Sequence, residues 1–164
     1  MIRDIKEILL TEEQIAGKVK ELATKISEDY RNKDLLVVGI LKGSVMFASD
    51  LIKNITIPCE IDFMAVSSYG SSTETSGVVR ILKDLDHSIE GKDIIIVEDI
   101  IDSGVTLDYL LKYLKTRKAN SIEIITFLTK PSRRKVDIQV KYCGFEVPDE
   151  FLVGYGLDFA EKYR

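Results

Sequence analysis

The segment Ile94–Thr106, with the sequence IIIVEDIIDSGVT, constrains the fold of this chain more than any other. It opens with four apolar residues, a run typical of a strand that is buried on both faces of a parallel sheet. Two acidic residues, Glu98 and Asp99, follow, and a turn of small residues then leads into a helical pattern. The segment therefore predicts a strand, a tight turn and a helix N-terminus, with the acids at the carboxyl end of the strand.

The rest of the chain alternates between helix and strand patterns. Apolar residues recur at helical spacing near 12–30, 44–52 and 106–117. Strand patterns cover 35–41, 59–67, 78–83, 93–97 and 121–129, with shorter strands expected near Val140 and Leu152. The strand 78–83 is expected to run antiparallel to 59–67, after a polar connection over 70–77. This order predicts an α/β fold with a mostly parallel central sheet flanked by helices.

Length and composition define the class of protein. The chain has 164 residues, 45% hydrophobic and 30% charged, and we expect a single domain over residues 1–164. A net charge of −4 argues against a nucleic-acid partner. No apolar run approaches the ~20 residues of a membrane span. Two distant cysteines, Cys59 and Cys143, and the lack of a secretory signal favour a cytoplasmic protein.

Polar elements follow several of the predicted strands, at the sheet edge where ligands of such folds bind. They are Leu41–Ser44, Glu98–Thr106, Lys130 and Phe151–Asp158. In the second element, the hydroxyls of Ser103 and Thr106 and the N–H groups of a turn at Gly104 suit a phosphate at a helix N-terminus. Glu98 and Asp99 would repel that phosphate unless they bind Mg²⁺ or sugar hydroxyls. The element therefore predicts a site for a phosphorylated sugar.

The string Val97–Thr106, VEDIIDSGVT, resembles the phosphoribosyl-pyrophosphate (PRPP) motif of type I phosphoribosyltransferases. Flanking elements resemble the hypoxanthine-guanine branch of this family and match in order over nearly the whole chain: Leu41–Ser44, Ser68-Tyr69, Lys130, Pro148–Asp158 and Arg164. The resemblance implies the type I phosphoribosyltransferase fold, with a flexible lid hairpin and a small hood region. It also implies a purine-salvage transferase that assembles as a homodimer or homotetramer.

The resemblance assigns residues to the PRPP half of the site. Glu98 and Asp99 would hold the ribose hydroxyls, directly or through Mg²⁺, and Asp158 would help to hold a second Mg²⁺. The 5′-phosphate would be surrounded by Asp102, Ser103, Gly104, Val105 and Thr106. Pyrophosphate would be bound by a loop with a cis peptide before its lysine and by the last residue of the sequence: Leu41, Lys42, Gly43 and Arg164.

The resemblance also implies an acid/base and a lid. Asp102 would approach N7 of the purine and manage its proton. The single histidine, His87, lies in a polar loop remote from any strand end, so proton transfer falls to a carboxylate, a lysine or a tyrosine. The connection over 70–77 would close over the site and exclude water. Ser68 and Tyr69 would contact pyrophosphate in the closed state.

The purine half of the site depends on residues after the fifth strand. Lys130 would donate to the 6-oxo group of the purine, which favours hypoxanthine, guanine or xanthine over adenine. Phe151 would stack on the purine face. Leu152 would present its backbone to the edge of the base, with Asp158 near the 2-position. The basic residues 133–135 are interpreted as a solvent-exposed run.

Together these elements predict Mg²⁺-dependent transfer of the 5-phosphoribosyl group from PRPP to N9 of hypoxanthine or guanine, which yields IMP or GMP and pyrophosphate. One alternative is a PRPP-sensing regulator of the same fold that binds RNA or DNA, although such a protein should carry a basic surface or an added DNA-binding segment. Another alternative is a xanthine-preferring enzyme, because Lys130 and Phe151 suit any 6-oxopurine. The sequence does not rank hypoxanthine against guanine.

Overall fold

The computed structural model describes residues 5–68 and 79–164, and its elements follow the predicted alternation. The helices are α1 (Glu12–Asp29), α2 (Val45–Asn54) and α3 (Val105–Lys115), with a short 3-10 turn, η2 (Pro131–Arg133). The strands are β1 (Leu35–Leu41), β2 (Glu60–Ser68), β3 (Val79–Lys83), β4 (Asp93–Ile101), β5 (Ser121–Thr129) and β6 (Tyr142–Glu146). No helix in these two ranges is long and apolar enough to cross a membrane.

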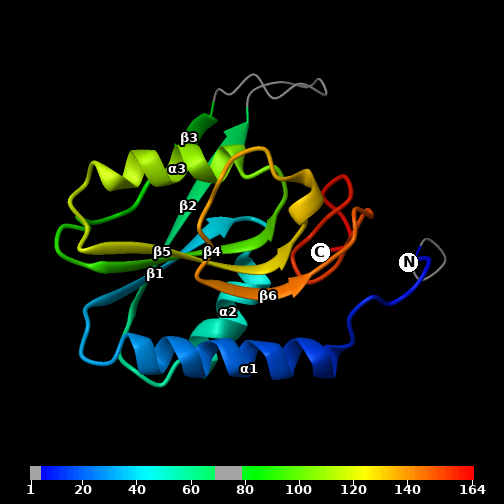
Figure 1. The fold of residues 1–164 in the computed structure, drawn as a ribbon, viewed down its shortest axis with the longest axis horizontal. Helices are drawn as coiled ribbons and strands as arrows, with labels where there is room; N and C mark the ends of the chain where they lie inside the picture. Colours follow the sequence, from blue (N-terminus) through cyan, green and yellow to red (C-terminus); the bar gives the residue numbers. More distant parts are fainter. Residues whose placement is uncertain (1–4, 69–78) are drawn as a thin grey trace.

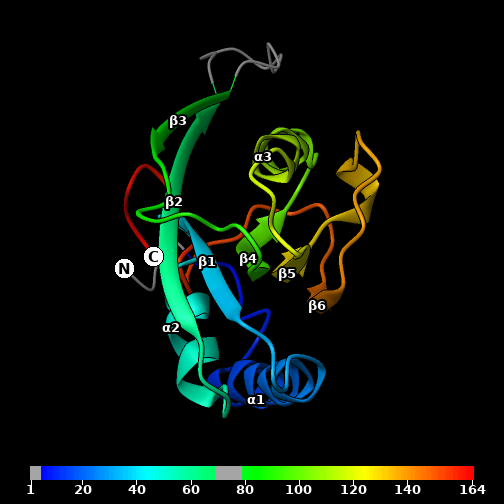
Figure 2. The same cartoon turned by 90° about the vertical axis from the view of Figure 1, so that its left-hand side faces the viewer.

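The six strands form one sheet in the order β3-β2-β1-β4-β5-β6. Neighbouring strands pair in parallel, except that β3 is antiparallel to β2. Helices α1 and α2 cover one face of the sheet and α3 covers the other (Figures 1 and 2). The segment after β6 curls beside the carboxyl ends of the strands, where the small hood region is expected (Figure 1). The predicted α/β fold is confirmed.

The central strand β4 contributes side chains to both halves of the core. Ile95 and Val97 pack with residues of α1 and α2, whereas Ile94 and Ile96 pack with residues of α3. All four side chains are fully buried. Burial on both faces explains why this strand is a continuous apolar run rather than an alternating one.

One predicted strand was too short, and another does not form. Strand β4 continues to Ile101, so Glu98 and Asp99 lie within the strand rather than after it. No strand forms at Leu152, because the chain that follows makes two tight turns, closed by the bridges Gly154↔Leu157 and Phe159↔Lys162. Several residues there have positive φ, a conformation that cannot continue a strand: Gly154, Tyr155, Gly156, Ala160, Glu161 and Tyr163.

Candidate active site

The two central strands separate at their carboxyl ends. Pairing between β1 and β4 stops at Gly39↔Val97, whereas pairing between β4 and β5 continues to Ile101↔Thr129. After β1 the chain turns toward β2, and after β4 it turns toward β5, so the sheet has its switch point between β1 and β4. Ligands of open α/β sheets bind in the crevice at such a point. The acids Glu98 and Asp99 lie at this crevice, one and two residues beyond Val97.

Burial raises the pKa of both acids, Glu98 and Asp99. Burial raises the pKa of Glu98 well above its ordinary value of 4.5, and the negative charge of Asp99 raises it further. Burial also raises the pKa of Asp99, opposed by a hydrogen bond from the N–H of Ile100 (2.8 Å) and by the charge of Arg164. A bound cation would favour the ionised form of both groups.

The oxygen donors at this point suit Mg²⁺. This ion commonly binds one or two carboxylates together with waters and substrate phosphates. In residues 5–68 and 79–164, no group of three or more acidic, histidine or cysteine side chains lies close enough to hold a metal by itself.

The loop after β1, predicted to bind pyrophosphate, packs directly against Asp99. It contains the predicted cis peptide, between Leu41 and Lys42. A Cβ atom at Gly43 would collide with Oδ2 of Asp99, so only glycine allows this approach. The Lys42 side chain is mostly exposed and its Nζ pairs with Oε2 of Glu161 at 2.8 Å.

The C-terminal segment closes over this loop. Gly156 has φ 102°, and a Cβ there would collide with the carbonyl oxygen of Gly43. Arg164 donates from Nη1 to the carbonyl oxygen of Gly156 (2.7 Å) and pairs through Nη2 with Oδ1 of Asp158 (3.0 Å). The structure thus brings Asp99, Asp158, Arg164 and the loop after β1 together, although 65 residues separate Asp99 from Arg164 in the sequence.

The turn after β4 leads into α3 as predicted. Gly104, with φ 82°, occupies the N-cap position, and no side chain caps the helix. The N–H groups of the first turn are therefore available to a ligand, with Val105 and Thr106 partly buried beside them. Ser103 Oγ accepts a weak hydrogen bond from the N–H of Val105 (3.4 Å). This arrangement suits a phosphate group.

The residues predicted to bind a purine meet beside β5. Lys130 is buried at the end of this strand, and its Nζ donates to the carbonyl oxygen of Glu150 at 2.7 Å. Phe151 is 74% exposed and meets Phe159 edge to face, with ring centroids 5.8 Å apart. Leu152 is partly buried against the core. The exposed ring of Phe151 is not a core aromatic, and most of its surface is accessible to a planar ligand.

Sequence reasoning missed several residues that contact the predicted site. Phe159 packs on Phe151, and Glu161 pairs with Lys42. Residues Arg133 and Lys135 are exposed, as interpreted from the sequence, whereas Arg134 is partly buried. Arg133 nevertheless pairs with Asp102, and Arg134 donates to the carbonyl oxygen of Asp102 at 3.3 Å. The two contacts with Asp102 join segments about 30 residues apart, and their only signal in the sequence is the turn-forming Pro131 before the arginines.

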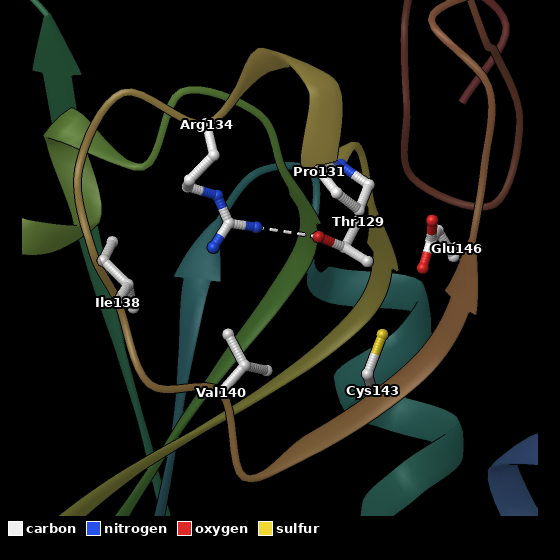
Figure 3. Close-up of a pocket in the computed structure, with 7 residues that line it drawn as sticks. All are labelled: Thr129, Pro131, Arg134, Ile138, Val140, Cys143 and Glu146. Carbon is white, nitrogen blue, oxygen red and sulfur yellow. Dashed lines mark hydrogen bonds between the residues drawn. The ribbon is translucent and has the colours of Figure 1, made fainter.

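A shallow pocket of about 360 Å³ lies next to this region, between β5, β6 and the connection that joins them (Figure 3). Its lining residues are Thr129, Pro131, Arg134, Ile138, Val140, Cys143 and Glu146. Arg134 reaches over the pocket and donates from Nη2 to Oγ1 of Thr129 at 2.8 Å (Figure 3). None of the predicted site residues lines it, so the pocket adjoins the candidate site without forming part of it.

The predicted lid is only partly covered by the described residues. Ser68 is the last residue of β2, at the same sheet edge as the loop after β1. Tyr69 and the connection over 70–77 lie outside the described residues. The lid therefore stays a prediction.

Comparison with known proteins identifies the family. A family model described as a phosphoribosyl transferase domain matches residues 6–160. The hypoxanthine-guanine phosphoribosyltransferase of Bacillus subtilis is 56% identical over 164 residues, which cover 100% of this chain and 91% of that protein.

Solved structures agree with this match. A hypoxanthine phosphoribosyltransferase of Staphylococcus aureus superposes with a TM-score of 0.96 at 56% identity, over 99% of this chain and 89% of that one. The hypoxanthine phosphoribosyl transferase of Trypanosoma cruzi, at 39% identity, superposes with a TM-score of 0.91 over 97% of this chain and 87% of that one. The chain therefore belongs to the phosphoribosyl transferase family, within its hypoxanthine-guanine phosphoribosyltransferase branch.

Proposed function

We propose that this chain transfers the 5-phosphoribosyl group of PRPP to N9 of hypoxanthine or guanine, in a Mg²⁺-dependent reaction that releases pyrophosphate. The observation that carries the proposal is the crevice between β1 and β4. There the uncapped start of α3, the poorly solvated acids Glu98 and Asp99, and the glycine-lined loop after β1 lie at one sheet edge. The relatives named above carry the matching activity in their names.

In the proposed complex, PRPP is held along this edge. The 5′-phosphate binds the turn from Asp102 to Thr106, and the ribose hydroxyls meet Glu98 and Asp99. Pyrophosphate binds the backbone of Leu41–Gly43 and Arg164. One Mg²⁺ bound at Glu98 and Asp99 and a second held with the help of Asp158 would neutralise charge on the leaving pyrophosphate. Ser68 and Tyr69 would complete the enclosure.

The purine is placed on the opposite side of the anomeric carbon. Phe151 stacks on its face, Leu152 and Asp158 meet its edge, and Lys130 donates to the 6-oxo group. Lys130 donates one of its three N–H groups to the carbonyl oxygen of Glu150 and its Nζ lies 3.7 Å from Oδ1 of Asp149, which leaves a donor for a base. Asp102 exchanges a proton at N7 while N9 forms the bond to C1 of the ribose.

The alternatives have less support. A PRPP-sensing regulator that binds nucleic acid should be basic, whereas this chain carries a net charge of −4. A xanthine-preferring enzyme would use the same Lys130 and Phe151, so only a comparison of substrates distinguishes it from an enzyme that prefers hypoxanthine or guanine. Assembly as a homodimer or homotetramer and a cytoplasmic location stay predictions. In the Trypanosoma cruzi relative, the C-terminal region has been studied for its role in oligomeric state and activity.

A panel of purines tests the proposal. The protein is incubated with PRPP and Mg²⁺ and with hypoxanthine, guanine, xanthine or adenine in turn, and the nucleotide formed is measured. We expect product with hypoxanthine, guanine or both, and little with adenine, whose 6-amino group is a donor facing the donor Lys130. Product with none of the four would refute the proposed reaction, and a clear preference for xanthine would favour the alternative enzyme.

A further inference from the structure

The two carboxylate oxygens of Asp102 have different surroundings. The side chain as a whole is 45% exposed. Its Oδ1 atom, however, is closed off from solvent and accepts no hydrogen bond within the described part of the chain. The exposed oxygen of this carboxylate is therefore Oδ2, and it is the oxygen that a ligand can reach.

Arg133 holds the enclosed oxygen. Its Nε lies 2.8 Å from Oδ1 of Asp102, an ion pair outside hydrogen-bonding geometry. Its Nη1 donates to Oδ1 of Asp149 at 3.1 Å. One guanidinium thus links the turn after β4 to the segment that leads into Phe151. A planar guanidinium can contact two carboxylates at once, which a lysine ammonium does less well.

The backbone that carries Arg133 is itself fixed to β4. Arg133 ends the 3-10 turn η2, and its N–H donates to the carbonyl oxygen of Lys130 at 3.1 Å. The N–H of Lys130 donates in turn to the carbonyl oxygen of Ile101 at 3.0 Å, next to Asp102. The N–H of Lys135 donates to the carbonyl oxygen of Ser103 at 2.9 Å. The segment that carries Arg133 and the turn that carries Asp102 are therefore joined by backbone hydrogen bonds on both sides of the ion pair.

We infer that Arg133 is a positioning residue for the proposed reaction. It binds Oδ1 of Asp102 and leaves Oδ2 directed to the purine. The inference rests on the proposed function, because it concerns the same acid/base. The arginine side chain is 51% exposed, and exposed ion pairs contribute little to stability, so its role lies in orientation rather than in folding.

The test replaces Arg133 and compares kcat, KM and Tm with those of the wild type. We expect R133A to lower kcat with hypoxanthine about 10- to 100-fold, the effect of displacing a reacting group by about 1 Å. The KM for PRPP and the Tm should stay unchanged, and R133K should fall between R133A and the wild type. K135A, which removes an exposed cation two residues away, is the matched control and should retain full activity.

Rescue of R133A by added guanidinium distinguishes a positioning role of Arg133 from a purely structural one. At concentrations far below those that unfold proteins, guanidinium should restore part of the kcat of R133A, whereas urea should not. If R133A lowers the Tm, R133K serves instead, because it keeps the positive charge and loses the planar guanidinium. It should lower kcat at an unchanged Tm.

The outcomes separate this inference from the proposed function. An active wild type with an equally active R133A would overturn the inference alone. The inference would also be overturned if added guanidinium restored none of the kcat of R133A and R133K were as slow as R133A. A wild type that forms no nucleotide with any purine would overturn the proposed function and this inference with it.

Discussion

At the scale of the residue, Asp102 carries the proposed proton transfer. We expect D102N to lower kcat about 10²- to 10⁴-fold, the usual contribution of general acid–base catalysis, because an amide cannot exchange a proton at N7. The KM for PRPP should change little, since the N–H groups of the turn are retained. Asp137 is an exposed aspartate in the connection after β5, and D137N is the matched control. Steady-state kinetics with hypoxanthine measure both, and near-normal turnover of D102N would remove Asp102 from this role.

Ionised Glu98 is expected to lower the stability of the free protein, although the same charge serves the binding of Mg²⁺ or ribose. Its pKa is raised in the fold, mainly by burial, so the stability it contributes is present below pH 4.5 and is lost as the pH rises through the raised pKa. Glutamine does not ionise. We therefore expect E98Q to be more stable than the wild type at neutral and alkaline pH, in the absence of Mg²⁺ and PRPP. Each 1 kcal/mol gained would raise the Tm by about 2–4 °C.

Thermal unfolding of E98Q and the wild type at about pH 4 and about pH 8 checks this expectation. The difference in Tm should appear at the higher pH and vanish at the lower one. An equal difference at both pH values, or none at pH 8, would mean that ionised Glu98 is not destabilising in the free protein.

The roles of single residues were only partly accessible from the sequence. The acids, the small-residue turn and Lys130 follow predicted strands and could be proposed in advance. The pairing of Arg133 with Asp102 could not, because the contact depends on how the segment after β5 folds back on the turn after β4. In the sequence, basic residues after a proline look like an exposed turn.

At the scale of the element, the C-terminal segment supports the loop after β1 through a glycine. G156A should raise the KM for PRPP by about tenfold or more, equivalent to ~1.4 kcal/mol, because the new Cβ would displace the carbonyl group of Gly43. G154A is the matched control: Gly154 also has positive φ, 92°, but a Cβ there meets no atom within 4 Å. Both variants carry backbone strain of about 1–2 kcal/mol, and only G156A disturbs the loop.

Kinetics with varied PRPP distinguish the two glycine variants. A KM for PRPP that rises equally in G154A and G156A would show that strain in the C-terminal segment, and not its contact with Gly43, matters for binding. A KM that is unchanged in G156A would contradict the importance of the contact.

The elements themselves were largely predictable. Strand β5 runs from Ser121 to Thr129 as expected, because a β-branched run is bounded by polar residues on one side and by Lys130-Pro131 on the other. Strand β4 was underestimated because Glu98 and Asp99 are unusual inside a strand, and only their place at an opened sheet edge makes them tolerable. The expected strand at Leu152 does not form because the following residues adopt positive φ values and make two tight turns, and Gly156 in the first of them lies against Gly43.

At the scale of the whole molecule, one sheet gathers residues from nearly the full length of the chain. Leu41 and Arg164 lie in sequence 123 residues apart, yet both belong to the cluster around Asp99. The order of the strands explains this. The switch point lies between β1 and β4, so the starts of α2 and α3, which follow these strands, lie at one edge of the sheet with the C-terminal segment. The alternation of patterns predicted this architecture, whereas the packing of the C-terminal segment depends on contacts that a sequence pattern does not encode.

The central claim is that the crevice transfers a phosphoribosyl group to a purine and excludes water from the reaction. The most direct measurement follows pyrophosphate and nucleotide together, with PRPP, Mg²⁺ and hypoxanthine, and again without the purine. The account predicts equal amounts of pyrophosphate and IMP in the first reaction and almost no pyrophosphate in the second. Pyrophosphate released at the same rate without hypoxanthine, or hypoxanthine left unconsumed, would contradict it.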